Sequence, residues 1–315
     1  MSFATLSRLL TLIAITVLIT GPTAARALTS AGPNRPVTVP ADYLITPFGY
    51  FHSSCVMHLA KGDVVRQDEK LIQHADGTSG NIQLCAYPHF NANGAMVPGD
   101  KQAVKPPTIS GWVESVSATT SSSYAYLTAD WAVPLAPTAN DGQTIFIFPG
   151  LEDINNTKTI LQPVLGWNSD FASAWGIASW NCCVNGNANE SSPVRVNSED
   201  IIRGTISSGC SSGTLSCPTW NVVTVDLTLN VSTGLVNSSF GQTFNWAFAG
   251  ALEVYNVVQC ADYPFSGETD FYNLGLYDYT FQLIANPGWS INAAGAKTPQ
   301  CNYSESLQQQ VNIIY

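Results

Sequence analysis

The feature that most limits the fold of this chain is a series of short β-type segments with no helical pattern between them. Eight segments after residue 110 are rich in Val, Ile, Thr and aromatic residues, and clusters of Gly, Ser and Asn separate them. No stretch combines helical spacing of apolar residues with capping signals. The pattern therefore predicts an all-β sandwich or barrel. The predicted strands are residues 124–133, 144–148, 159–165, 172–180, 201–206, 220–229, 244–255 and 279–284.

Residues 1–27 have the pattern of a secretory signal peptide. Arg8 precedes an apolar run over residues 9–19, and the small residues around Arg26 form an Ala-x-Ala cleavage site. The apolar run is too short to span a bilayer, and no run of about 20 apolar residues follows it. We therefore expect these residues to be removed and the mature protein to be secreted, with no membrane anchor.

The eight cysteines are an even number, which suits disulfides in an oxidising compartment. Cys210 and Cys217 flank a Ser/Gly-rich tip and are expected to staple a small loop, whereas the spacing assigns no partners to four others, Cys182, Cys183, Cys260 and Cys301. Zinc is disfavoured, because Cys-x-x-Cys is absent and all four histidines precede residue 90. We expect no metal and no cofactor.

Five Asn-x-Ser/Thr sequons would carry surface sugars if the source is eukaryotic. They begin at Asn155, Asn189, Asn230, Asn237 and Asn302.

Charge divides the chain into an amino-terminal segment, residues 28–109, and a body, residues 110–315. The segment holds six Lys/Arg and six Asp/Glu, whereas the body holds four Lys/Arg and sixteen Asp/Glu. Residues 105–107, Lys-Pro-Pro, are typical of a stiff linker between the two. So acidic a body argues against nucleic acid and anionic membranes as partners, because both require basic patches. We expect a monomer.

The body has no histidine after residue 89 and so cannot form a Ser-His-Asp or Cys-His site by itself. Carboxylates and carboxamides remain for chemistry. Carboxyl groups titrate near pH 4, so an enzyme built from them would work in acid.

Residues 148–162 set a carboxylate and a carboxamide among apolar residues. Two predicted strands flank a polar turn that contains Glu152, and Gln162 falls in the second strand. Pro163 follows Gln162 and removes a ladder hydrogen bond, which predicts an edge, a bulge or a cleft rim there and not a sheet centre. On this signal alone, Gln162 is expected to be a solvated face residue, as a Gln in a strand usually is.

A family resemblance rests on several motifs spread over residues 110–285. The chain resembles the eqolisin-type glutamic endopeptidases, and the motifs fall in the order that this family has. The motifs are Phe148-x-Gly150-Leu151-Glu152, Ile160-Leu161-Gln162, Trp175 with Trp180, Val194-x-Val196 with Asp200-Ile201, Trp246, and Leu252-Glu253-Val254-Tyr255.

The resemblance implies a secreted acid protease with a lectin- or glucanase-like sandwich of two antiparallel sheets. It implies a catalytic pair in which Glu253 is general base and acid and Gln162 stabilises the oxyanion, with no metal and no acyl-enzyme. Its partner would be a protein or peptide substrate. Phe148, Glu152, Trp175 and Trp180 would support the pair or bind substrate.

The chain also departs from the family pattern. Glu152 stands where the family has Asp, Phe148 stands where it has Trp, and residues 175–180 lack the acidic residue between the paired tryptophans. For the supporting residues, purely structural roles stay open. The two tryptophans suit core packing as well as a cleft wall, and Glu152 either orients Gln162 through a hydrogen bond or is a solvated turn residue.

Two alternatives stay open at this stage. The first concerns the whole protein, which is either a peptidase or a carbohydrate-binding or structural sandwich without catalysis. The second concerns residues 28–109, which are either a removable pro-segment docked on the body through its cations or a permanent companion domain, containing some strand, stapled by Cys55 and Cys85.

Overall fold

The computed structural model describes residues 34–66, 70–97, 111–155, 159–182, 186–292, 301, 304–307 and 310–315. The predicted signal peptide, the predicted linker, Cys183 and the sequon at Asn302 lie outside these ranges. Within them, no helix is long and apolar enough to cross a membrane. The chain is nearly all β, with short helical turns at Ser53–Cys55 and Cys260–Asp262.

Two large sheets and one small sheet make up the described structure. Sheet I contains β21 (Ser290–Asn292), β9 (Trp112–Thr119), β19 (Trp246–Tyr255), β11 (Thr144–Glu152), β12 (Ile160–Trp167), β13 (Trp175–Cys182), β14 (Ala188–Ser191) and β3 (Val56–Leu59), in this spatial order, and β15 (Val194–Arg195) pairs with β13. Sheet II contains β22 (Ser304–Leu307), β23 (Val311–Ile314), β20 (Glu268–Asp278), β10 (Tyr124–Ala132), β16 (Ile201–Ser208), β17 (Thr219–Asp226), β18 (Val231–Ser238), β4 (Val64–Arg66), β5 (Leu71–Gln73) and β6 (Ser79–Asn81). The small sheet contains β1 (Tyr43–Thr46), β2 (Gly49–His52), β7 (His89–Phe90) and β8 (Met96–Val97).

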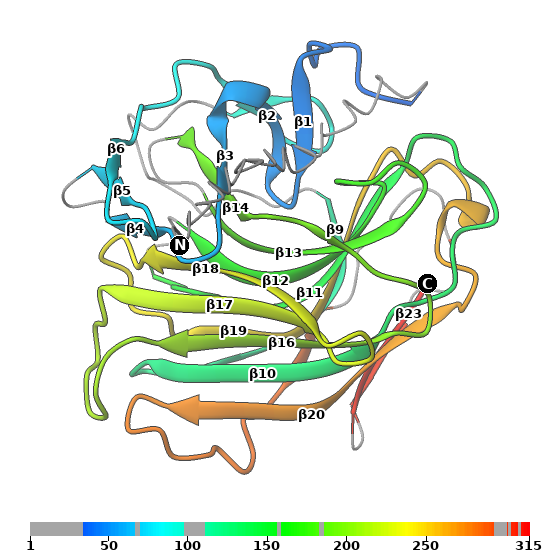
Figure 1. Cartoon of the computed structure of the whole chain (residues 1–315). Coiled ribbons are helices and arrows are strands. Elements are labelled where there is room, and N and C mark those ends of the chain that lie inside the picture. Colours follow the sequence, from blue (N-terminus) through cyan, green and yellow to red (C-terminus); the bar gives the residue numbers. More distant parts are fainter. Residues whose placement is uncertain are drawn as a thin grey trace, which may run out of the picture.

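Sheets I and II pack face to face, as Figure 1 shows for β11 to β13 behind β16, β17 and β10. Alternate residues of each strand fill the space between them, including Trp131 of β10, Ile147 of β11, Leu165 of β12 and Ile202 of β16. Most neighbouring strands are antiparallel. The predicted all-β sandwich is therefore confirmed.

One predicted strand, residues 279–284, is wrong. β20 ends at Asp278, whose carboxylate accepts hydrogen bonds from the backbone N–H groups of Thr280 and Gln282 and so closes a turn. The sequence pattern also missed several strands of the body, among them the long strands β9, β18 and β20. β18 reads Val-Ser-Thr-Gly-Leu-Val-Asn-Ser, a composition too polar to stand out from a loop.

The expectation that Gln162 lies away from a sheet centre is also wrong, because β12 runs between β11 and β13. The register of β11 and β12 places Pro149 opposite Pro163. The pairing of the two strands is interrupted there. It stops after the pair Ile147 and Leu165 and resumes at the pair Leu151 and Leu161. Two prolines that face each other share one gap in the ladder, and this makes proline tolerable in central strands.

The amino-terminal segment adds strands to both large sheets and covers one of them. β3 pairs in parallel with β14, and β4 pairs in parallel with β18. In Figure 1, β1 and β2 (blue) lie over sheet I, and residues 39–56 share one apolar cluster with its outward side chains. The segment was expected to contact the body through cations and carboxylates, but the contact is mainly apolar. Of the described ion pairs, His58 with Glu190 at 2.9 Å joins the segment to the body.

Three described disulfides tie the chain together. Cys210–Cys217 closes the predicted small loop, and Cys55–Cys85 lies wholly inside the amino-terminal segment. Cys260–Cys301 is a pair that spacing alone did not assign, and Cys182 is also disulfide-bonded.

Burial separates the sequons. Asn189 and Asn237 are buried strand residues, whereas Asn155 and Asn230 are exposed. Because a glycan cannot be accommodated inside a packed sheet, we expect a eukaryotic host to glycosylate Asn155 and Asn230 but not the buried pair. Glycopeptide mapping of the secreted protein checks this expectation, and full occupancy at Asn189 or Asn237 would contradict the described packing.

Candidate active site

The outward face of sheet I, called here the covered face, carries most of the predicted site residues. In β12 the side chains of Leu161 and Leu165 point toward sheet II, so those of Ile160, Gln162 and Val164 point outward, under the amino-terminal segment. The same alternation places Phe148 and Glu152 of β11, Trp180 of β13 and Glu253 of β19 on this face.

Trp175 does not belong to the covered face. It packs edge-on against Trp167 at 5.3 Å between ring centroids, inside the cluster between the two sheets. Trp180 is five residues further along the same strand, and an odd separation puts the two side chains on opposite faces. Phe148, in contrast, contacts Trp112 edge-on at 5.5 Å on the covered face.

Gln162 is fully buried, so it is not a solvated face residue. Neither its Oε1 nor its Nε2 has a hydrogen-bond partner among the described residues. Trp180 lies directly opposite it on β13, and Gly150 lies opposite on β11 by register. A buried carboxamide without partners costs about 1–3 kcal/mol, so this group is held ready to bind something.

Glu253 is also fully buried, but both of its carboxylate oxygens are hydrogen-bonded. Tyr255 donates its hydroxyl to Oε1 at 2.5 Å, and Trp112 donates Nε1–H to Oε2 at 3.1 Å. Burial, followed by the neighbouring Glu253, raises the pKa of Tyr255 well above its usual value, so its hydroxyl stays protonated as a donor. Gly111 leaves room for the carboxylate, since a Cβ there would lie 3.0 Å from Oε1.

The structure places Gln162 and Glu253 on one face but not side by side. Glu253 is level with Phe146 of the intervening β11, whereas Gln162 is level with Gly150. Two strand spacings across and four residues along separate their Cα atoms by roughly 16 Å. The side chains cannot touch at that separation. A water molecule and a peptide carbonyl can lie between them.

Glu152 ends β11, nearer to Gln162, one strand across and two residues along. It is only 2% exposed, so it is not a solvated turn residue. It does not orient Gln162 by a hydrogen bond either, because the carboxamide of Gln162 is unpaired. Burial raises the pKa of Glu152 to about 8, so this carboxyl is largely neutral at pH 7.

The space over Gln162 and Glu253 is filled by the hairpin tip, defined as residues 46–50, where β1 ends and β2 begins. Phe48 contacts Trp180 edge-on, with ring centroids 6.0 Å apart. Tyr50 packs edge-on against the Tyr255 ring, with ring centroids 5.6 Å apart. The tip thus crosses the covered face from the Gln162 side to the Glu253 side.

Sequence reasoning missed two of the residues that define this site. Tyr255 was noted only as the end of a motif, and neither it nor Trp112 was predicted as a partner of Glu253. For Tyr255 a signal was available, because it is two positions after Glu253 in one strand, and such residues have their side chains on the same face. For Trp112 there was none, since its place beside Glu253 depends on the pairing of β9 with β19.

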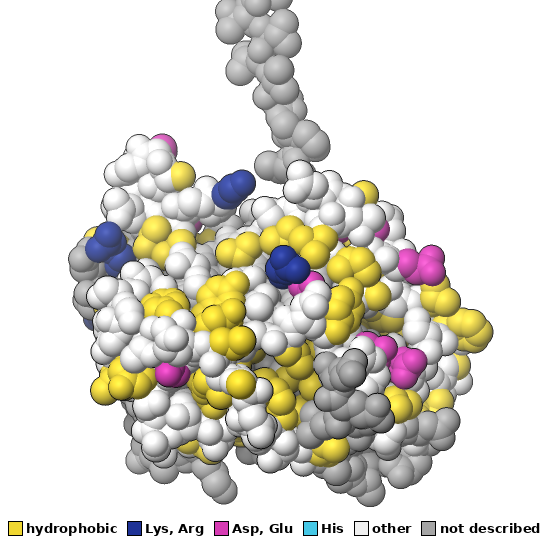
Figure 2. Space-filling view, turned by 90° about the horizontal axis from the view of Figure 1, so that it is seen from below, with side chains coloured by type: hydrophobic (Ala, Val, Ile, Leu, Met, Phe, Trp, Pro, Cys, Tyr) yellow, Lys and Arg dark blue, Asp and Glu magenta, His cyan; other side chains and the backbone are white. Residues whose placement is uncertain are grey.

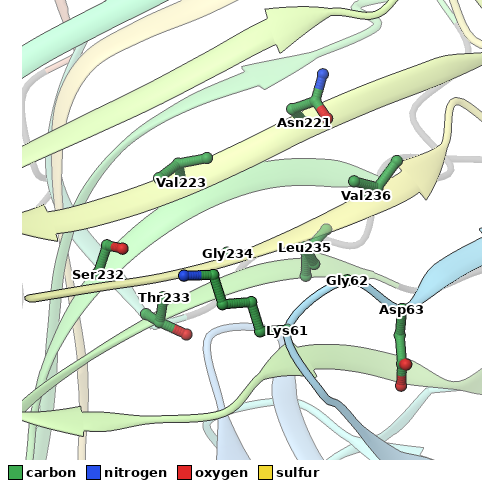
Figure 3. Close-up of a pocket in the computed structure, with 10 residues that line it drawn as sticks. All are labelled: Lys61, Gly62, Asp63, Asn221, Val223, Ser232, Thr233, Gly234, Leu235 and Val236. Carbon is green, nitrogen blue, oxygen red and sulfur yellow. The ribbon is translucent and has the colours of Figure 1, made fainter. Parts of the chain in front are cut away.

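Two surface cavities lie away from these residues. One, of about 180 Å³, lies where the turn at Lys61 and Asp63 meets β17 and β18 (Figure 3). The other, of about 470 Å³, is lined by Glu199, Glu268, Asp270 and Tyr272 at the β20 end of sheet II. None of the predicted site residues lines either cavity, because the hairpin tip occupies the covered face.

No protein-family model and no curated protein matches this chain. Among solved structures, scytalidoglutamic peptidase with a peptide-based transition-state analogue is similar, with 14% identity and a TM-score of 0.49 over 65% of this chain and 98% of that chain. SCP-B, an eqolisin-family peptidase in complex with the tripeptide Ala-Ile-His, has 14% identity and a TM-score of 0.47 over the same shares.

Aspergilloglutamic peptidase from Aspergillus niger has 14% identity and a TM-score of 0.36 over 55% of this chain and 98% of that chain. Each of these matches covers nearly the whole length of the peptidase concerned.

The unpaired carboxamide gives a stability prediction. Gln162→Met keeps the volume but removes two unsatisfied polar atoms, so we expect the free energy of unfolding to rise by about 1 kcal/mol. Gln143 is the matched control, because it is equally buried but hydrogen-bonded to Ala139 O, Asp262 O and Asp141 N. Gln143→Met should cost about 1–3 kcal/mol. Urea unfolding measures both, and equal losses in the two variants would show that Gln162 is satisfied in solution.

Glu152 predicts how stability depends on pH. Its usual pKa of 4.5 in the unfolded chain rises to about 8 in the folded protein. The stabilisation is therefore complete below pH 4.5 and is lost as the pH rises through about 8. Over this interval the free energy of unfolding should fall by on the order of 4 kcal/mol.

Glu152→Gln should remove most of that fall. A smaller slope of the same sign should remain from Asp226, whose pKa burial also raises. Denaturant unfolding at a series of pH values tests this, and an unchanged slope in the variant would assign the effect to another group.

Proposed function

We propose that this chain is a secreted glutamic-type endopeptidase that cuts peptide bonds in acid and is held latent by its amino-terminal segment. The observation that carries the proposal is the unpaired, buried carboxamide of Gln162 on a face that also holds Glu253 and is spanned by a peptide segment of the same chain. The Nε2–H of Gln162 lacks an acceptor and its Oε1 lacks a donor, and a peptide bond can supply both, so a site already spanned by a peptide segment suits peptide hydrolysis.

Gln162 would supply the oxyanion donor. When water adds to a peptide carbonyl, negative charge develops on the carbonyl oxygen, and the Nε2–H of Gln162 can donate to it. The group is buried and has no competing partner, so no bond must break before it acts. This preorganisation is the source of most electrostatic catalysis.

Glu253 would move the proton. Its carboxylate takes a proton from the attacking water and returns it to the leaving amine, so no covalent intermediate forms. Trp112 and Tyr255 fix its two oxygens. Glu152 is a second carboxyl on the same face, neutral up to about pH 8, and it can act only as a proton donor below that pH.

Activity requires the hairpin tip to leave the covered face, so residues 28–109 would act as a pro-segment. Its disulfide, Cys55–Cys85, is internal to it. A cut between residues 97 and 111 would therefore free the segment from that side, leaving only non-covalent contacts such as the pairing of β3 with β14. The segment contains no dibasic pair, so the cut would be autocatalytic. A permanent companion domain is the opposing proposal, and the intact mass of the active form separates the two.

Cleavage of a denatured protein at roughly pH 3–5 tests the proposal. The full chain, after exposure to acid, should release peptides. Glu253→Gln and Gln162→Ala should each reduce turnover by at least about 100-fold while circular dichroism stays unchanged. Glu152→Gln, measured alongside, shows whether the second carboxyl takes part. If a folded Glu253→Gln variant cleaves at the wild-type rate, the proposal fails.

A second candidate, carbohydrate binding, is favoured by one observation on the outer face of sheet II. Asp130 holds Arg203 through two hydrogen bonds of 2.7 Å and also accepts one from Asn273. The hydrogen bond to Asp130 chiefly raises the pKa of Arg203, and Tyr126 and Tyr272 lie near enough to add to it.

Such a fixed, charge-balanced donor beside aromatic rings suits a neutral sugar. Figure 2 views the molecule from the side where β20 lies and shows hydrophobic patches with few charged groups. Retention on immobilised glycans without peptide release would favour this function over the peptidase.

A further inference from the structure

The hairpin tip shows which side chains the covered face accepts. It presents two aromatic residues, Phe48 and Tyr50, on either side of Gly49. Both aromatic side chains are buried, Phe48 being 8% exposed and Tyr50 fully enclosed. Their contacts on the body differ, so each marks a separate position on the face.

Phe48 marks a position on the Gln162 side. Its ring meets Trp180, the residue directly opposite Gln162 on β13. Both rings belong to one apolar cluster with Ile160 and Val164, which flank Gln162 on the same face of β12. A phenyl-sized apolar site therefore adjoins the unpaired carboxamide.

Tyr50 marks a position on the Glu253 side. Its ring packs edge-on against Tyr255, and its hydroxyl donates to Asn256 Oδ1 at 2.8 Å. Tyr255 in turn holds Glu253. Between the two positions, the backbone of Gly49 lies close enough to the Tyr255 hydroxyl to lower its pKa slightly, against the larger effect of burial.

The tip is held in a shape that a peptidase could not cut easily. Thr46 pairs with Gly49, and the Thr46 hydroxyl donates to Gly49 O and accepts from Phe48 N. Gly49 has φ +115°, and a Cβ there would lie 2.2 Å from Phe90 O. The backbone of such a tight turn is not extended along the site, whereas that of a linear peptide can be.

We propose that the hairpin tip is an uncleaved substrate analogue, and that the substrates are peptides with aromatic residues two positions apart, one against Trp180 and one against Tyr255. The part of this inference that calls such peptides substrates rests on the proposed function. The binding preference itself is independent of any cleavage.

Binding is measured first, on the full chain with Glu253→Gln so that the probe is not consumed. Phe48→Ala empties the Trp180 position. The probe is acetyl-Pro-Phe-Gly-Tyr-amide, compared with the same peptide carrying Ala in place of Phe, by isothermal titration near pH 4. We expect the Phe peptide to bind Phe48→Ala at least about 10-fold more tightly than the Ala peptide, since a buried aromatic ring contributes more than 1.4 kcal/mol. Adding Trp180→Ala should abolish the difference.

Phe51→Ala is the matched control. Phe51 is buried in the same segment but stacks on His89 at 4.8 Å, so its loss weakens the segment without opening the Trp180 position. If the Phe51→Ala variant gains binding as strongly as the Phe48→Ala variant, or if both peptides bind Phe48→Ala alike, the inference is overturned.

A second readout needs no variant to fold. The acid-treated wild-type chain is incubated with a denatured protein, and the sites at which that protein is cut are mapped. Sites should be enriched for aromatic residues two positions apart around the cut. Binding preference without any cleavage would refute the proposed function and leave the recognition intact. Cleavage without aromatic enrichment would refute the recognition and leave the peptidase.

Discussion

The structure depends on sheet I being buried on both of its faces. Every described residue of β11, β12 and β13 is buried. An antiparallel sheet of a sandwich commonly packs on one face and meets water on the other, with apolar and polar residues alternating. Here sheet II covers one face and the amino-terminal segment covers the other. Polar side chains on the covered face are consequently deprived of water, and this gives Gln162 and Glu152 their unusual states.

This constraint explains what could be predicted from the sequence. The all-β class followed from segment composition, and the small loop between Cys210 and Cys217 followed from spacing. The opposite orientations of Trp175 and Trp180 were also available, because five residues separate them in one strand. The covering of Gln162 was not available. Strand residues that are apolar on both faces show that something covers them, but not which segment of the chain does so.

The relative placement of Gln162 and Glu253 depends on details that leave no trace in a sequence pattern. A bulge in β19 between Phe248 and Gly250 shifts the register of everything after it, Glu253 included. The register of β11 against β12, which places prolines 149 and 163 opposite each other, is likewise not encoded in either motif. Each residue could be named as a candidate from its motif. Their separation could come only from the paired strands between them.

The covering also decides how the site can open. The contact is made by apolar and aromatic side chains, whose attraction does not fall when carboxylates are protonated, in contrast to a contact between cations and acids. Glu152 acts in the opposite direction, because a neutral carboxyl is what burial favours, and acid keeps it neutral. Protonation of Glu152 in acid therefore does not favour opening of the covered face. A cut in the connecting chain has a different effect. While the chain is intact, the segment stays at a high effective concentration near the body and its hairpin tip rebinds readily, and the cut removes this advantage. Opening of the covered face is thus controlled by the covalent continuity of the chain more than by its charge.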